Sequence, residues 1–194
     1  MIEKLKKYCS EIVDFTSSEL DELGNYFSQN SVNKKEFLLE NGQVCNFIGF
    51  LTQGCMRHFH IKDGEEITCD ISLEESFVTE FNSFNSGSKA KVAIQALEDS
   101  ILFVINKKEL TELYQMNPKF EQLGRKIAER VAMRNSDIAM SLASEKPEKR
   151  YANLLREKPE IFQRVQQKYI ANILGIKPES LSRLQKRVFE KRKS

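Results

Sequence analysis

The spacing of apolar residues changes twice along this chain, and these changes restrict the folds that it can adopt. Over residues 32–106, short β-rich runs are separated by turn dipeptides such as NG, QG and DG, which is typical of an antiparallel sandwich or barrel. Residues 1–30 are predicted to form short helices. That prediction rests on the apolar residues Leu20, Leu23 and Phe27 and on the candidate caps Ser17 and Ser18. The pattern predicts an α+β protein with helices on both sides of a β domain.

A second helical signal is much longer. Apolar residues drift around one face of a helix predicted from about Pro118 to Ala143, and Arg134 interrupts the stripe. The stripe consists of Phe120, Leu123, Ile127, Val131, Ile138 and Leu142. An apolar seam must be buried, either on the β domain or on a second copy of the helix. Because the seam extends further than one small sandwich can cover, we expect a homodimer joined along residues 118–143.

The dipeptide Lys146-Pro147 ends this helix, because the residue before a proline disfavours helical backbone. Beyond it the pattern is helical and basic, with no second β-rich block. A length of 194 residues suits one ordinary domain and a small second one. We therefore expect a β domain over residues 1–117, a central helix over residues 118–145 and a helical domain over residues 146–194.

Charge is distributed unevenly between these parts. Residues 1–144 hold 16 Lys and Arg against 22 Asp and Glu, a net charge of −6. Residues 145–194 hold 14 against 6, a net charge of +8. A basic module on an acidic body is expected to meet a polyanion. Charge alone does not distinguish DNA from RNA or from a membrane surface.

The segment from Gln167 to Lys186 has the pattern of two short helices joined by a sharp turn. Gly175 marks the turn, because glycine readily adopts positive φ. Pro178 suits the first turn of the second helix, where its fixed φ is helical and no N–H is needed. The predicted inner faces are Ile170, Ala171, Leu174 and Ile176, then Leu181, Leu184 and Val188. The pattern predicts a DNA-reading helix-turn-helix, and a helical hairpin with a solvated charged face is the alternative.

The outward face of the second helix carries side chains that suit base edges in a major groove. Arg183 can pair with guanine through two hydrogen bonds, and Glu179 can accept a hydrogen bond from cytosine. Lys177, Lys186 and the segment Lys191-Arg192-Lys193 are better placed for phosphates, which contribute affinity but no sequence choice. The predicted contacts to double-stranded DNA are Gln167, Lys168, Lys177, Glu179, Ser180, Arg183, Lys186 and Arg187.

Taken together, these segments resemble the cyclic-AMP receptor protein/FNR family of bacterial transcription regulators over roughly residues 15–190. The resemblance rests on GCMRHFHIKDGEE, QALEDSILFVINKKELTEL, the long helix and IANILGIKPESLSRLQKRV. It implies an N-terminal jelly-roll domain like those that bind cyclic nucleotides, a dimerising central helix and a C-terminal winged helix. It also implies control of transcription through contact with RNA polymerase.

The resemblance assigns base contact to Glu179 and Arg183. Pro178 stands where the family has its first base-reading Arg, so the operator sequence is expected to differ. The sequence ends six residues after Val188, which leaves little room for a second hairpin. We therefore expect the wing to be short or absent.

The resemblance also suggests an effector site. Glu80 matches the Glu that binds the ribose of cyclic AMP, but Ala90 stands in place of the phosphate-binding Arg, between Lys89 and Lys91. The pair on the long helix that contacts the nucleotide corresponds to Asn135 and Ser136. A buried phosphate needs a charge-assisted partner, and Lys replaces a bidentate Arg poorly. The candidate effector residues are thus Glu80, Lys89, Lys91, Asn135 and Ser136, while cyclic-AMP binding is not expected and another anionic or apolar effector, or none, stays open.

Parts of the sequence are also compatible with two other classes of function. His58 and His60, with Glu65 further on, imitate the first metal-ligand motif of cupin enzymes, which are also jelly rolls. The sequence has only two histidines, so a third His ligand does not exist. The other alternative is a cyclic-nucleotide-fold module that regulates a partner protein. No nucleophilic triad, phosphate loop or paired carboxylate is present, so neither an enzyme nor a cofactor is predicted.

Cysteine usage and hydropathy indicate the compartment. Four cysteines are scattered without a CxxC pair, which suggests thiols in a reducing environment and no iron–sulfur site. No apolar run approaches the ~18 residues that a membrane span requires. The N-terminal segment lacks the apolar core of a signal peptide. We expect a cytoplasmic protein without a membrane partner.

Overall fold

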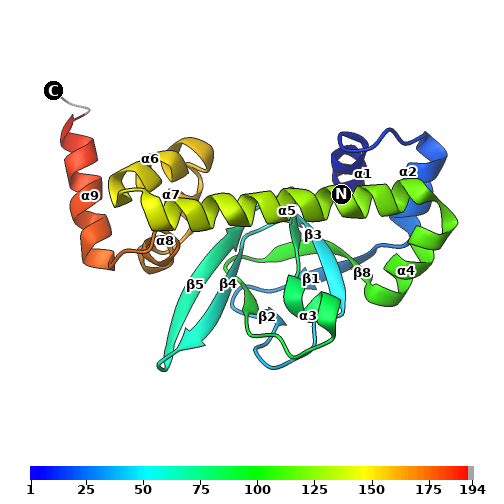
Figure 1. The fold of residues 1–194 in the computed structure, drawn as a ribbon, viewed down its shortest axis with the longest axis horizontal. Coiled ribbons are helices and arrows are strands. Elements are labelled where there is room, and N and C mark those ends of the chain that lie inside the picture. Colours follow the sequence, from blue (N-terminus) through cyan, green and yellow to red (C-terminus); the bar gives the residue numbers. More distant parts are fainter. Residues whose placement is uncertain (192–194) are drawn as a thin grey trace.

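The computed structural model describes residues 1–191 of the chain (Figure 1). The strands are β1 Ser28–Val32, β2 Phe37–Leu39, β3 Phe47–Gln53, β4 Met56–Lys62, β5 Glu65–Ser72, β6 Ser76–Val78, β7 Ala93–Ala96 and β8 Ser100–Asn106. The helices are α1 Ile2–Ser10, α2 Ser17–Asn25, α3 Phe81–Ser86, α4 Lys107–Met116, α5 Pro118–Ser144, α6 Pro147–Glu157, α7 Ile161–Arg164, α8 Gln167–Ile173 and α9 Pro178–Lys191.

The strands form two four-stranded antiparallel sheets, in the orders β1-β8-β3-β6 and β2-β7-β4-β5. Alternate residues point inward, and the two sheets enclose a core that includes Leu51, Met56, Val78, Ile94 and Leu102. The predicted antiparallel jelly roll is therefore confirmed. β4 and β5 form a hairpin on the side of the sandwich that faces the C-terminal helices (Figure 1).

The N-terminal segment differs from its prediction in two details. Helix α2 is capped by Thr16, whose side chain accepts the Glu19 N–H, and not by Ser17 or Ser18. The Glu19 carboxylate in turn accepts the Thr16 N–H at 2.8 Å, which completes a capping box. Helical structure also ends before residue 30, because Ser28 begins strand β1 and pairs with β8.

Glu19 also ties α2 to the start of the long helix. Its carboxylate accepts hydrogen bonds from Lys119 Nζ and Asn117 Nδ2, both at 2.9 Å. The bond from Lys119, with those from the Thr16 cap and Asn117, lowers the pKa of Glu19 to about 2. Asn117 caps α5 and Pro118 occupies its first turn, so the helix begins where the sequence predicts.

Helix α5 runs along the sandwich and continues beyond it to the C-terminal helices (Figure 1). The assignment of its whole apolar stripe to a dimer seam is wrong for the N-terminal half. Phe120 and Leu123 are buried in the protein's own core, where the Phe120 ring stacks on Phe15 at 5.5 Å. The C-terminal half leaves Met133 and Met140 68% and 66% exposed.

The C-terminal helices pack against the sandwich. One apolar cluster joins Cys55, Ile71 and Leu73 of the β domain to residues of α7 and α8, including Ile161 and Tyr169. The first helix of the helix-turn-helix, α8, lies against strand β5. The two parts of the chain thus share a core as well as a connecting helix.

Candidate nucleic-acid interface and effector cavity

Helices α8 and α9 cross over a small apolar centre. Ile170, Ala171 and Leu181 are fully buried, and Leu174 and Leu184 are nearly so. The absence of a large side chain at Ala171 allows the helices to approach closely. The structure therefore places the residues predicted for the inner faces where a helix-turn-helix requires them.

The turn between these helices depends on Gly175, whose φ of +64° lies in the left-handed region. Its N–H donates to Asn172 O at 2.8 Å, and the Ile176 N–H donates to Ala171 O at 3.0 Å, closing the end of α8. A Cβ atom at Gly175 would lie 3.0 Å from Leu142 Cδ2. Arg150 Nε donates to Leu174 O at 3.0 Å. Nothing in the sequence marks this support by Arg150.

The outer face of α9 is open to solvent. Glu179, Arg183, Lys186 and Arg187 are exposed, whereas Ser180 is half-buried. Arg183 Nε donates back to Glu179 O at 3.3 Å, so the two predicted base-reading residues lie one turn apart on the same face. Arg187 Nη2 contacts Glu148 Oε1 of α6 at 3.2 Å.

The predicted phosphate contacts lie around this face. Gln167, Lys168 and Lys177 are exposed, and Gln167 Nε2 donates to Gln185 Oε1 of α9 at 3.2 Å. Arg192 and Lys193, also predicted to contact phosphates, lie outside the described residues. Up to residue 191, no strand follows β8, so the part of the chain described here contains no wing hairpin.

A cavity of about 500 Å³ lies between the sandwich and α5. Its wall is mostly aliphatic and aromatic, and includes Leu23, Ile48, Phe77, Leu113, Leu123 and Val131. Glu80 lines it but is engaged as the cap of α3, because its carboxylate accepts the Ser83 N–H at 2.6 Å. Asn135 also lines it.

The other predicted effector residues are not brought to this cavity. Lys89, Lys91 and Ser136 are exposed and do not contribute to its wall. The two lysines flank Ala90, which is buried and whose N–H donates to Gln43 O at 2.7 Å.

Two arginines reach the cavity, and both already have acidic partners. Arg134 Nη1 donates to Asp70 Oδ2 at 2.8 Å, and Arg125 Nη1 donates to Glu129 Oε1 at 2.6 Å. Burial raises the pKa of Asp70, but Arg134 outweighs it and holds the pKa below its usual value. The sequence showed Arg134 only as a break in an apolar stripe.

A buried histidine completes the polar part of the wall. His58 is hydrogen-bonded to Ser72 Oγ through Nε2 at 2.9 Å. Burial lowers the pKa of His58, so the neutral ring is favoured. His60 is half-buried, and within residues 1–191 no group of three His, Cys, Asp or Glu residues is arranged to hold a metal ion. Burial also raises the pKa of the Cys9 and Cys55 thiols to about 12.

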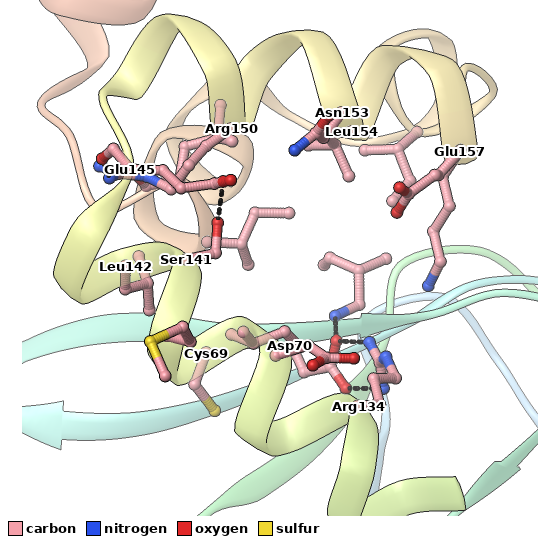
Figure 2. Close-up of a pocket in the computed structure, with 18 of the residues that line it drawn as sticks. Cys69, Asp70, Arg134, Ser141, Leu142, Glu145, Arg150, Asn153, Leu154 and Glu157 are labelled. Atoms are coloured by element: carbon pink, nitrogen blue, oxygen red, sulfur yellow. Dashed lines mark hydrogen bonds and ion pairs between the residues drawn. The ribbon is translucent and has the colours of Figure 1, made fainter.

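A second cavity, of about 720 Å³, lies between α5, α6 and β5. Figure 2 shows Asp70 and Arg134 on one side and Arg150, Asn153 and Glu157 on the other. The Asp70–Arg134 pair contributes to the walls of both cavities. It therefore forms a partition between them.

Comparison with known proteins agrees with this architecture. Residues 29–117 match the sequence model of the family described as the cyclic nucleotide-binding domain. No curated protein sequence matches the chain. In the described part of the chain, no helix is both long enough and apolar enough to cross a bilayer.

Solved structures extend the likeness to the C-terminal helices. FixK2 from Bradyrhizobium japonicum has a TM-score of 0.71 at 16% identity, over 85% of each chain. CLP from Xanthomonas campestris, described as a c-di-GMP-responsive global regulator, has a TM-score of 0.70 at 17% identity, over 91% of this chain and 93% of its own. The catabolite activator protein of Thermus thermophilus has a TM-score of 0.59 at 17% identity, over 95% and 87%.

These matches define the fold of the chain. Residues 29–117 form a cyclic nucleotide-binding-type domain. The chain as a whole has the fold of the cyclic-AMP receptor protein/FNR regulators, so the resemblance seen in the sequence is confirmed.

Proposed function

We propose that this protein is a sequence-specific DNA-binding regulator of transcription that acts in the cytoplasm as a homodimer. The observation that carries the proposal is the exposed face of α9, where Glu179 and Arg183 lie one turn apart above a helix-turn-helix core. Residues 1–117 would sense, residues 118–145 dimerise and residues 146–194 read DNA. Contact with RNA polymerase is proposed from the family likeness.

The physical support is the match between this face and a duplex groove. An Arg side chain can bind guanine O6 and N7 together, and a Glu can accept from cytosine N4. The net charge of +8 over residues 145–194 supplies the attraction to the phosphate backbone. Two such helices related by a two-fold axis would read half-sites about 34 Å, or roughly 10 base pairs, apart.

Arg183→Ala and Lys186→Ala test this assignment as a pair. We expect Arg183→Ala to weaken binding to a selected duplex by roughly 1–3 kcal/mol and to relax preference at one base pair. Lys186→Ala should weaken selected and random duplexes alike and flatten the salt dependence. The measurement is selection from a random duplex pool, followed by titration of the recovered sequences.

Arg156→Ala is the matched control, because it removes one exposed positive charge from α6, where Arg156 contacts Glu157. It should leave the selected sequence unchanged. If Arg183→Ala weakened binding to selected and random duplexes equally, Arg183 would not read a base. A pool from which no sequence is enriched would reject the proposed function.

We further propose that the 500 Å³ cavity is the effector site and that it takes an uncharged, largely apolar molecule. Its wall is mostly apolar, and Arg134 and Arg125 are each held by a carboxylate. His58, Ser72 and Asn135 offer hydrogen bonds but no net charge. A buried anion would therefore lack a free cationic partner among the described wall residues.

A further inference from the structure

The β4–β5 hairpin serves both the cavity and the DNA-reading domain. His58, Asp70 and Ser72 line the cavity behind it. On the same two strands, the Thr68 N–H donates to Asn172 Oδ1 of α8 at 3.1 Å, and the Arg57 guanidinium lies 4.4 Å from the centre of the Tyr169 ring. The hairpin is thus a shared wall between the sensing and DNA-reading parts.

A single arginine clamps the two parts together next to this hairpin. Arg164, at the end of α7, donates two hydrogen bonds to the Glu74 carboxylate, both at 2.8 Å. It also donates to Glu98 at 3.0 and 2.7 Å and to Gly54 O at 3.0 Å. All three partners belong to the β domain, 66 to 110 residues away in sequence. Bidentate arginine–carboxylate pairs are strong and directional.

The docked face also contains features that oppose docking. Arg57 is 3% exposed, yet its Nη1 atom has no hydrogen-bond partner in the described protein, and neither does the buried Thr68 Oγ1. A buried polar atom without a partner is costly, and exposure to water would satisfy it. Apolar contacts and the Arg164 clamp therefore hold the two parts together at a face whose unpartnered polar atoms favour separation. Opposing contributions of this kind allow both a docked and an undocked state.

The charge of the docked face indicates whether docking favours or opposes DNA binding. Glu66, Glu74 and Glu98 lie on the β domain beside a module with a net charge of +8. DNA phosphates are anionic, as these carboxylates are, and are attracted to the same module. Carboxylates at the docked face also repel a duplex that approaches it.

We propose that Arg164, Glu74 and Glu98 form an intramolecular latch that holds the helix-turn-helix domain on the β4–β5 hairpin and competes with DNA. Opening the latch frees the domain to take up the orientation that a duplex demands. The proposal rests on the DNA-binding function proposed above. It goes beyond that function because it names the surface of the chain that restrains the domain.

The test compares Glu74→Gln/Glu98→Gln with a charge-matched control, Glu3→Gln/Glu112→Gln. The control removes two exposed carboxylates of the β domain that pair with Lys6 and Lys108, away from the latch. Docking is followed without DNA by hydrogen exchange of the Thr68 amide, whose bond to Asn172 exists only when the domain is docked. DNA binding is followed by fluorescence anisotropy on a duplex of about 30 base pairs recovered by selection, long enough for two half-sites.

The latch variant should exchange the Thr68 amide at least tenfold faster and bind the duplex roughly 5- to 20-fold more tightly, within the usual range of coupling between sites. The control should change either quantity less than twofold. Arg164→Gln provides a second route to the exchange measurement if the double variant does not fold.

Unchanged Thr68 exchange in both latch variants would overturn the proposal, because the clamp would not hold the domain. Faster exchange with unchanged or weaker duplex binding would overturn it as well, because the docked arrangement would not oppose DNA. If the unaltered protein binds no duplex, the proposed function and this competition fail together. Duplex binding without a gain in the variant rejects the competition alone.

Discussion

His58 is kept neutral by burial beside a polar cluster. Ser72 is its hydrogen-bond partner at 2.9 Å, and its pKa is lowered first by burial and then by Arg134, against the opposing effects of Asp70 and Glu80. In the unfolded chain the ring titrates near 6.5. At a pH just below about 6.5, His58 therefore binds a proton in the unfolded state but not in the folded state.

This difference gives stability a pH dependence of known sign. Above about 6.5 neither state is protonated at His58, and its contribution is fully present. As pH falls from about 6.5 toward the folded pKa, stability is lost at no more than about 1.4 kcal/mol per pH unit. We expect the urea concentration at the midpoint of unfolding to decrease as the pH is lowered from 7.5 to about 5.5. His58→Gln should remove most of that decrease. An equal fall in His58→Gln would show that another group is responsible.

At the scale of elements, α5 divides into two halves with different partners. Phe120 and Leu123 are buried against the protein's own N-terminal helices, so they are not available to a second copy. Met133 and Met140, one heptad apart, are the most exposed large apolar side chains of the helix. Residues one heptad apart lie on the same face of a helix, and an exposed apolar face of this kind can pair with a second helix.

Met133→Glu/Met140→Glu tests whether this half of α5 joins two copies. Placing carboxylates on a helix seam would bury charges without partners, and we expect the molar mass in light scattering to fall to that of one chain. Val44→Glu, at a residue 50% exposed in the β domain, is the control and should leave the mass unchanged. A dimer that survives both substitutions would place the interface elsewhere.

At the scale of the whole molecule, the cavity lies where sandwich, α3–α4 and α5 meet, so its chemistry depends on all of them. Ala90 is buried at the position where the resemblance implies a phosphate-binding arginine, and Lys89 and Lys91 are exposed to solvent. We expect cyclic AMP to leave the melting temperature unchanged. A ligand present at 100 times its Kd would add about 2.7 kcal/mol, which a melting curve detects easily.

An uncharged aromatic compound such as 2-naphthol should raise the melting temperature instead. Ala128 lines the cavity, and Ala128→Phe would fill part of it, so this variant should lose the effect. Stabilisation by cyclic AMP, or by 2-naphthol equally in Ala128→Phe, would contradict the proposed effector chemistry.

Features that depend on near neighbours along the chain can be predicted from the sequence alone. The apolar period distinguished strands from helices, and Gly175 and Pro178 located the turn and the second helix of the helix-turn-helix. These signals are local, because helical and extended backbones place fixed spacings on one face. Even so, the helix cap was placed one or two residues late, at Ser17 or Ser18 in place of Thr16.

Contacts between residues far apart in the sequence follow from the packing of the folded chain. Arg164 bonds to Glu74 and Glu98, 90 and 66 residues away, and Asp70 pairs with Arg134 across 64 residues. No spacing rule links such residues, since their contact depends on how the sheets, α5 and the C-terminal helices pack. The same packing buries Phe120 and Leu123 of the apolar stripe of α5 within the chain and leaves Leu142, near its end, 44% exposed.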